Sequence, residues 1–134
     1  MYCFDTDVLS AAMHREPKLS VLRRLAWVPD AEQSTSAITL GELIYGAIRR
    51  RNRRLAERIA DLVTPAMRVF AFDRSAAEVL GRLKADLEAE GSRLDEPDLR
   101  IASICLARDL TLATGNVRHF SRVPGLLVEN WLAE

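Results

Sequence analysis

The sequence contains few of the features that mark exported, membrane-bound or disordered chains. Its 134 residues include only two cysteines, five prolines and six glycines, and there is no low-complexity tract. No apolar run approaches the roughly 18 residues that a membrane-spanning helix requires. The first residues contain neither a basic region nor a long apolar stretch. We therefore expect no export signal, no membrane association and a cytoplasmic location.

The chain also has no net charge, because 19 basic residues balance 19 acidic ones. The molecule as a whole therefore exerts no general attraction on a polyanion. Its arginines are unevenly distributed, and five of them surround Asn52: Arg49, Arg50, Arg51, Arg53 and Arg54. Guanidinium groups suit bidentate contacts with phosphate or carboxylate. A solvated helix end or helix junction explains this run equally well.

Segments with strand-like and helix-like apolar spacing alternate along the chain. Strands are expected over 2–4, 34–38, 67–72, 110–114 and, at an edge, 126–128. Helices are expected between them, with an apolar face in the second one formed by Leu19, Leu22, Leu25 and Ala26. The next helix is expected to begin with a capping box of Thr39 and Glu42. Its apolar stripe would be Leu43, Ile44, Ala47 and Ile48.

This alternation predicts one domain over residues 1–134. Strands that alternate with helices are typical of a parallel sheet between two helical layers. The expected fold class is therefore a three-layer α/β/α sandwich with a central, mostly parallel sheet of four to five strands.

Three carboxylates stand where an expected element begins or ends. Asp5 ends the first strand, Glu42 lies in the first turn of the helix after the second strand, and Asp98 lies in the first turn of the helix before the fourth. The carboxyl ends of parallel strands share one edge of the sheet with the N-termini of the helices that follow them. This rule brings Asp5 and Glu42 together, but it does not account for Asp98.

Each acid also has a purely structural explanation. Asp5 or Asp7 can cap the first helix, and Asp98 can complement the dipole of its own helix. Thr39 and Glu42 can satisfy each other's backbone in the capping box. If the acids instead converge, they repel unless protons or a cation intervene, and their oxygen atoms suit Mg²⁺ or Mn²⁺. A site of that kind predicts metal-assisted hydrolysis of a phosphodiester.

Four segments resemble the PIN-domain nucleases, and more closely the VapC-type toxins of bacterial toxin–antitoxin pairs. They are Phe4 to Leu9, Thr39 to Gly46, Asp98 to Ser103, and Leu112 to Phe120 followed by Val123 to Leu126. Together they occur in the family's order over nearly the whole chain. The resemblance implies an α/β/α nuclease that binds Mg²⁺ or Mn²⁺ and cuts single-stranded or structured RNA.

By this resemblance, the metal-binding acids are Asp5, Glu42 and Asp98. Thr6 and Thr114 are expected to position them through their hydroxyl groups. Asn116 stands where many PIN domains have a fourth acid, so we expect it to orient the phosphate or the water and expect one tightly held ion. Asp7 stands where the family often has Asn. We expect it to cap the first helix, and its charge beside the site has no assigned role.

The main hypothesis is a Mg²⁺-dependent endoribonuclease in which water attacks the phosphate in line and leaves a 5′-phosphate and a 3′-hydroxyl. The arginines around Asn52 then become candidate contacts for the RNA backbone, with tRNA or rRNA as the expected substrate. The resemblance also implies a homodimer and a small antitoxin that covers the active-site groove. Operator DNA would be bound only through that antitoxin.

Two other functions stay open at this point. A strand that ends in Asp5, Thr6 and Asp7 also resembles the haloacid-dehalogenase-type phosphatases. That family needs a lysine near the site and an acid pair late in the chain, whereas this chain has only Lys18 and Lys84. The other alternative is a non-catalytic module that binds an antitoxin and, with it, operator DNA.

Overall fold

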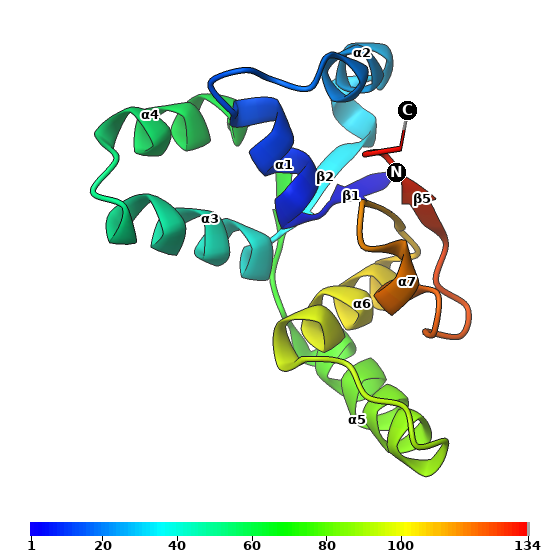
Figure 1. The fold of residues 1–134 in the computed structure, drawn as a ribbon. Helices are drawn as coiled ribbons and strands as arrows, with labels where there is room; N and C mark the ends of the chain where they lie inside the picture. Colours follow the sequence, from blue (N-terminus) through cyan, green and yellow to red (C-terminus); the bar gives the residue numbers. More distant parts are fainter. Residues whose placement is uncertain (134) are drawn as a thin grey trace.

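Five short strands form one parallel sheet at the centre of the structure, a computed structural model that describes residues 1–133 (Figure 1). The strands are β1 (Tyr2–Phe4), β2 (Gln33–Ser36), β3 (Arg68–Phe70), β4 (Thr111–Thr114) and β5 (Val128–Asn130). They lie in the order β3-β2-β1-β4-β5, and each neighbouring pair is parallel. The expected α/β/α fold class is confirmed. Glu134, the last residue of the expected domain, lies outside the described residues.

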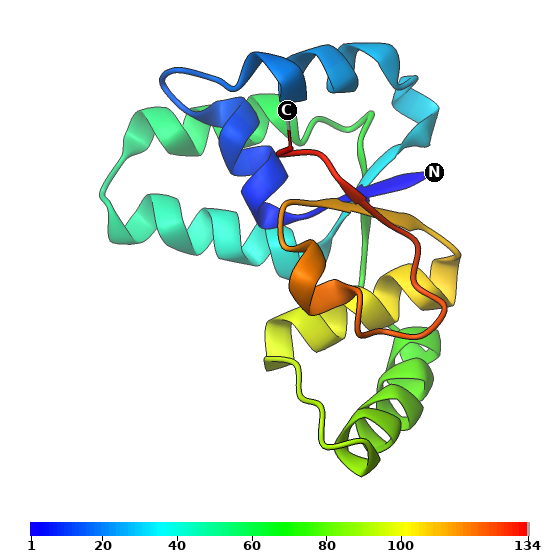
Figure 2. The same ribbon diagram turned by 45° about the vertical axis from the view of Figure 1, so that its right-hand side comes forward.

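Helices cover both faces of this sheet. On one face lie α1 (Thr6–Met13), α2 (Leu19–Trp27), α3 (Ala37–Arg49) and α4 (Arg53–Leu62), with the short 3₁₀ helix η1 (Asp30–Glu32) before β2. On the other face lie α5 (Arg74–Ala89), α6 (Glu96–Arg108) and α7 (Val117–Phe120). Figures 1 and 2 show that α3 and α4 form a hairpin that projects to one side of the sheet. No helix within residues 1–133 combines the length and apolar character needed to cross a bilayer.

Each face of the sheet has its own apolar core, because successive strand residues point to opposite sides. Cys3 of β1 and Leu112 of β4 pack with α5 and α6. Phe4 and Ala113, the next residue in each strand, pack with the helices of the opposite layer. The central strands are therefore fixed from both sides, and the residues that follow them leave the sheet at defined positions.

The neighbouring strand β2 is polar although three of its four residues, Ser34, Thr35 and Ser36, are buried. Ser34 Oγ donates a hydrogen bond to the carbonyl oxygen of Tyr2 at 2.6 Å, and Thr35 Oγ1 donates to that of Phe4 at 2.8 Å. Buried hydroxyl groups with such partners avoid the cost of an unsatisfied donor. These bonds add to the parallel pairing of β1 with β2, and so they strengthen the position at which β1 ends.

The start of α3 differs from the expected capping box. The hydroxyl of Ser36 accepts the N–H of Thr39 at 3.0 Å, so Ser36 is the N-cap and the helix begins at Ala37. The predicted cap at Thr39 is therefore wrong, and Glu42 lies in the second turn rather than the first. Both Ser36 and Thr39 are good cap residues, and the end of β2 decides between them. Glu42 is consequently free of any capping role.

The expected apolar faces of α2 and α3 are also partly wrong. Leu19, Leu22 and Ala26 of α2 are exposed, whereas Leu25 packs partly buried against the core as predicted. Val21, which was not predicted, is the fully buried side chain of this helix. In α3, Leu43 is buried as expected, whereas Ile48 is 70% exposed. The reason for the second difference is the position of the α3–α4 hairpin, which extends past the sheet and leaves part of the stripe without a surface to cover.

The segment after β5 returns to the sheet through Trp131. This side chain is 2% exposed, and its ring centroid lies 5.3 Å from that of Tyr2 and 5.1 Å from that of Phe4. Its backbone N–H donates to the carbonyl oxygen of Thr114 at 3.1 Å. Trp131 therefore links the C-terminal segment to the two central strands.

Replacement of Trp131 by alanine should lower the free energy of unfolding by about 3–5 kcal/mol, because it removes a large side chain from the core. Urea unfolding followed by circular dichroism measures this loss. Trp27 is the matched control, since it is the only other tryptophan in the chain and is 87% exposed. Trp27→Ala should change the same quantity by about 0.5 kcal/mol or less. Equal losses in the two variants would contradict the core position of Trp131.

Candidate active site

The strand order creates a crevice between β1 and β4. From β1 the chain proceeds outward through β2 and β3, and it then returns to the other side of β1 to form β4. In parallel α/β sheets, ligands bind beyond the carboxyl ends of the strands at such a switch point. Asp5 follows β1 directly, and its N–H donates to the carbonyl oxygen of Ala113 at 3.0 Å. Asp5 therefore stands at the position where this fold binds ligands.

A cavity of about 410 Å³ opens at this point, and we term it the acidic pocket. Four of the residues that line it are carboxylates: Asp5, Asp7, Glu42 and Asp98. The others are Thr6, Gly115, Asn116 and Leu132. The structure thus brings together the three predicted acids and Asn116 from four separate parts of the chain. Thr6 lines the pocket as well, and Thr114 lies beneath it, buried at the end of β4.

Asp98 reaches the pocket by a route that the sequence argument did not include. It lies in the first turn of α6, as predicted. A helix that connects two parallel strands must run antiparallel to them, and it therefore begins at their carboxyl edge. Because α6 leads into β4, its N-terminus and the end of β1 lie at the same edge of the sheet.

The Asp5 carboxylate is nearly buried and held on both oxygen atoms. Its Oδ1 accepts the N–H of Thr6 at 2.8 Å, and its Oδ2 accepts the hydroxyl of Thr114 at 2.8 Å. Asp5 is thus the N-cap of α1 and a pocket residue at once. Burial raises the pKa of Asp5 from 3.8 to about 6, with smaller contributions from the charges of Asp7 and Asp98, while the Thr114 hydrogen bond opposes the rise.

Glu42 is exposed at the rim of the pocket, and its Oε1 accepts the hydroxyl of Thr6 at 2.9 Å. Thr6 and Thr114 therefore each donate to one of the predicted metal-binding acids. Both hydrogen bonds are of the kind by which a hydroxyl could position a carboxylate, as predicted for Thr6 and Thr114. That positioning role stays a prediction.

Asp7 does not cap α1, because Asp5 occupies that position, so the expected role of Asp7 is wrong. Its Oδ2 instead accepts the N–H of Gly115 at 2.9 Å, across the crevice from β1 to β4. Its Oδ1 is buried without a hydrogen-bond partner among the described residues. Burial raises the pKa of Asp7, while the Gly115 hydrogen bond opposes the rise. The acid that the sequence left unassigned is therefore part of the pocket.

Asn116 and His119 lie beside Asp98. The Asn116 side-chain nitrogen Nδ2 lies 2.9 Å from His119 Nδ1, and the same ring nitrogen lies 3.9 Å from Asp98 Oδ2. Burial raises the pKa of Asp98, as does the charge of Asp95, whereas the charge of His119 opposes this rise. Sequence reasoning missed His119, Gly115 and Leu132 as neighbours of the site. For His119, the spacing of three residues from Asn116 at the start of a short helix was the available signal.

The donors of the acidic pocket fit a hard divalent cation. They are carboxylate and amide oxygens, which Mg²⁺ and Mn²⁺ prefer. Asp7 Oδ1 is buried without a partner, and the charges of Asp7 and Asp98 add to the rise that burial causes in the pKa of Asp5, so negative charges lie close together here. In residues 1–133, no three acidic, histidine or cysteine side chains already form a ready-made metal cage. The metal-binding roles of Asp5, Glu42 and Asp98 therefore stay a prediction.

The five arginines around Asn52 do not line the acidic pocket. All five are exposed, at the turn between α3 and α4. This turn lies at the far end of α3 from the pocket, because the N-terminus of α3 adjoins the sheet (Figure 1). The structure therefore separates the predicted acids from the predicted RNA contacts.

Comparison with known proteins gives a separate line of evidence. The family model described as PIN domain matches residues 2–126. The chain is 30% identical over 135 residues to Ribonuclease VapC2 of Haemophilus influenzae, with 98% of each chain covered. It is 36% identical over 98 residues to the tRNA(fMet)-specific endonuclease VapC of Salmonella typhimurium, with 72% of this chain and 73% of the relative covered.

Among solved structures, the chain is similar to VapBC2 from Rickettsia felis bound to a DNA fragment from their promoter. The TM-score is 0.86 at 28% identity, over 97% of this chain and 98% of the other. The chain therefore shares its fold with a chain of that DNA-bound structure.

The raised pKa of Asp5 predicts a pH dependence of stability in metal-free buffer. Folding favours the protonated carboxyl, so the stability that Asp5 contributes is present below pH 3.8 and is lost as the pH rises through about 6. Asp5→Asn cannot ionise at this position. The free energy of unfolding of Asp5→Asn, relative to that of the wild type, should therefore rise by about 3 kcal/mol as the pH increases from below 3.8 to above about 6. Urea unfolding at a series of pH values measures the difference.

Asp73 provides a control of opposite sign. Asp73 caps α5, and its Oδ1 accepts the N–H of Ala76 at 3.0 Å. This hydrogen bond lowers the pKa of Asp73. The stability that Asp73 contributes is present above its ordinary pKa and is lost as the pH falls. Asp73→Asn should therefore lose stability relative to the wild type as the pH rises. A difference between Asp5→Asn and the wild type that does not vary with pH would show that position 5 holds no desolvated acid.

Gly115 is required by the close approach of Asp7 and Leu132. A Cβ atom at this position would overlap the Leu132 side chain and lie 2.9 Å from Asp7 Oδ2. Gly115→Ala should lower the free energy of unfolding by about 1–3 kcal/mol. Gly41→Ala is the control, because Gly41 lies in α3 with open space around it. That change should raise the same quantity by about 0.5–1 kcal/mol. The midpoint of thermal unfolding measures both changes. Equal shifts of this midpoint in the two variants would contradict the close packing at Gly115.

Proposed function

Because this chain belongs to the PIN-domain family, we propose that it is a Mg²⁺-dependent endoribonuclease toxin of the VapC type, inhibited by a cognate antitoxin. The observation that carries the proposal is the convergence of four carboxylates in one pocket at the switch point of the sheet. The names of two relatives, a ribonuclease and a tRNA(fMet)-specific endonuclease, support RNA as the substrate. We propose tRNA or rRNA as its class.

In this proposal Asp5, Glu42 and Asp98 hold a Mg²⁺ or Mn²⁺ ion through their carboxylate oxygens. When bound, such an ion neutralises the acids and stabilises the charge that develops on a phosphodiester during hydrolysis. The hydroxyl of Thr114 keeps Asp5 turned toward the pocket, and that of Thr6 keeps Glu42 there. Two of the three acids therefore cannot rotate away without losing a hydrogen bond.

Asn116 supplies a neutral polar group at the same site. Its backbone N–H donates to Thr114 Oγ1 at 2.9 Å, which places the residue directly above the Asp5 anchor. We assign to its side-chain amide the orientation of the scissile phosphate or of the attacking water. Hydrolysis in line would leave a 5′-phosphate and a 3′-hydroxyl.

The partners follow from the relatives. The Rickettsia felis structure holds VapBC2 on promoter DNA, and we extend this arrangement to the present chain: a cognate antitoxin, contact with operator DNA only through it, a homodimer and a cytoplasmic site of action. Residues 1–134 would act as one nuclease domain. The phosphatase alternative has less support, because no lysine lines the acidic pocket, and Lys18 Nζ donates to the backbone carbonyl oxygen of Leu132 at its edge.

Asp98→Asn should reduce metal-dependent cleavage of RNA by roughly 100-fold or more while leaving the fold intact, because it removes a charge that the ion requires. Gel analysis of RNA incubated with purified protein and Mg²⁺ measures the rate, and circular dichroism checks the fold. Asp95→Asn is the matched control, since Asp95 precedes the same helix but does not line the acidic pocket.

Full cleavage by Asp98→Asn would contradict the assignment of the site. If the wild-type protein binds its antitoxin but cleaves no RNA with metal present, the chain is a binding module and the endonuclease proposal fails. An Asp95→Asn variant that loses as much activity as Asp98→Asn would show a general effect of charge at the start of α6.

A further inference from the structure

The five arginines around Asn52 do not form one group, because the backbone turns sharply between them. Arg51 has a φ of 49°, in the left-handed region where a helix commonly ends. Its N–H donates to the carbonyl oxygen of Ile48, and that of Asn52 donates to Ala47, both at 3.0 Å. These two bonds form the Schellman motif, which closes α3. Asn52 then caps α4 by accepting the N–H of Leu55 at 3.0 Å.

One side of this turn opens into a cavity of about 480 Å³, which we term the arginine cavity. Its polar lining comes from the end of α1, the α3–α4 turn and the start of α4: His14, Arg15, Arg50, Asn52, Arg54 and Arg58. Only two arginines of the run are among them, and the other two arginines come from elsewhere in the chain. Arg49, Arg51 and Arg53 do not line the cavity.

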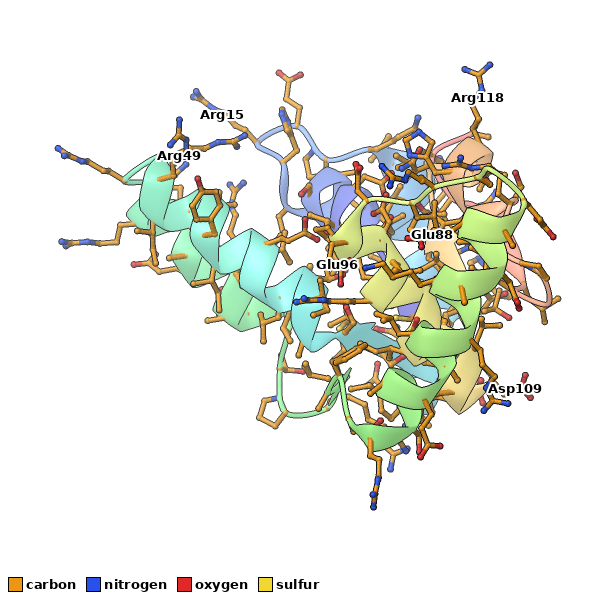
Figure 3. All side chains as sticks on the ribbon, turned by 90° about the horizontal axis from the view of Figure 1, so that it is seen from below. Arg15, Arg49, Glu88, Glu96, Asp109 and Arg118 are labelled. Atoms are coloured by element: carbon orange, nitrogen blue, oxygen red, sulfur yellow. The ribbon has the colours of Figure 1, made fainter. Side chains whose placement is uncertain are left out.

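The four arginines of this cavity have no carboxylate partner inside it. No carboxylate lines the cavity, and within residues 1–133 none of the four forms an ion pair. Arg58 is held in place by a hydrogen bond from Nη1 to the carbonyl oxygen of Met13 at 2.6 Å. Figure 3 shows Arg15 and Arg49 at the end of the molecule formed by the α3–α4 hairpin, with Arg118 at the opposite end. Clustered guanidinium groups of this kind favour a phosphate or carboxylate ligand.

Helix α1 connects the arginine cavity to the acidic pocket. Its first residues, Thr6 and Asp7, line the acidic pocket, and Met13 at its end lines the arginine cavity. The eight residues of α1 span about 12 Å. A polymer bound in the acidic pocket that runs along this helix reaches the arginine cavity within about three or four stacked nucleotides.

A polyanion needs such a second contact, because the acidic pocket repels it. Four carboxylates line that pocket, and one divalent ion neutralises only half of their charge. We propose that the arginine cavity binds a backbone phosphate of single-stranded RNA and so holds the substrate across the acidic pocket. This inference rests on the proposed nuclease function, and it selects among the arginines that the sequence treats alike.

The test compares two double variants that lose the same charge from the same run. Arg50→Gln/Arg54→Gln alters the arginine cavity, whereas Arg49→Gln/Arg53→Gln alters exposed arginines outside it. Binding of a fluorescent single-stranded RNA of about 12 nucleotides is measured by anisotropy at several salt concentrations with Ca²⁺ in place of Mg²⁺, which keeps a divalent ion available to the acidic pocket, and gel analysis checks that the RNA stays intact. Circular dichroism confirms that both variants are folded.

The cavity pair should weaken RNA binding by about 5- to 10-fold and reduce the slope of log affinity against log salt by about 1. The control pair should change the affinity by about twofold or less. Arg15→Gln, on a different segment, should weaken binding in the same direction as the cavity pair. Asp61 lines a neighbouring cavity with Arg15 and Arg58, so the cavity pair is drawn from Arg50 and Arg54, which do not line that neighbouring cavity.

Equal losses in the two double variants would overturn the inference, because they would show a general effect of net charge. If the cavity pair binds RNA normally but no longer binds the antitoxin, the cavity is a site for an acidic peptide and the inference is also wrong. Cleavage by the wild-type protein is measured separately with Mg²⁺. If the wild type neither cleaves nor binds RNA, the nuclease proposal itself fails. If the wild type cleaves RNA but the two double variants bind it equally weakly, only the present inference fails.

Discussion

The partly desolvated carboxylate of Asp5 is the interaction on which the site depends. It is 7% exposed at the junction of β1 and β4, and it accepts hydrogen bonds from the Thr6 N–H and the Thr114 hydroxyl. One donor belongs to the helix after β1 and the other to the end of β4. A shift of β1 relative to β4 would break the Thr114 bond and leave the buried Oδ2 of Asp5 without a partner, which is costly. The pairing of β1 with β4 therefore determines whether the acidic pocket exists.

The rest of the fold fixes that pairing. Apolar residues of β1 and β4 reach separate cores on the two faces of the sheet, the hydroxyls of β2 bond to the backbone of β1, and Trp131 lies across Tyr2 and Phe4. The α3–α4 hairpin has no such support on its outer side, where Ile48 is exposed. The molecule thus combines a rigid carboxyl edge, which suits preorganised chemistry, with a projecting hairpin that offers surface for partners.

A net charge of zero conceals a separation of charge. Carboxylates gather at the switch point of the sheet, and arginines gather at the turn between α3 and α4. The two groups have different requirements: the acids need a cation, and the arginines need an anion. A phosphodiester chain with a divalent ion would satisfy both at once: under the proposed function, Asp5, Glu42 and Asp98 would hold the ion, which would neutralise the acids, and the arginines would contact the phosphates. Neither group alone would select this ligand.

The sequence by itself determined the alternation of strands and helices, the acids at their ends, and several caps. The helix former and breaker chemistry of α5 is an example: Asp73 is its N-cap, and Gly91, with a φ of 70°, follows its last turn. These features depend on local spacing and local backbone chemistry, which a sequence displays directly.

Tertiary structure alone decided which local alternatives prevail and which residues meet. Because β2 ends at Ser36, that residue caps α3 in place of Thr39. The direction of α6 places Asp98 at the carboxyl edge of β1. The pairing of β1 with β4 places Gly115 where its N–H donates to Asp7. The turn at Arg51 divided a continuous run of arginines into two groups. Periodicity shows which side of an element is apolar, but the relative placement of elements depends on packing between residues distant in sequence.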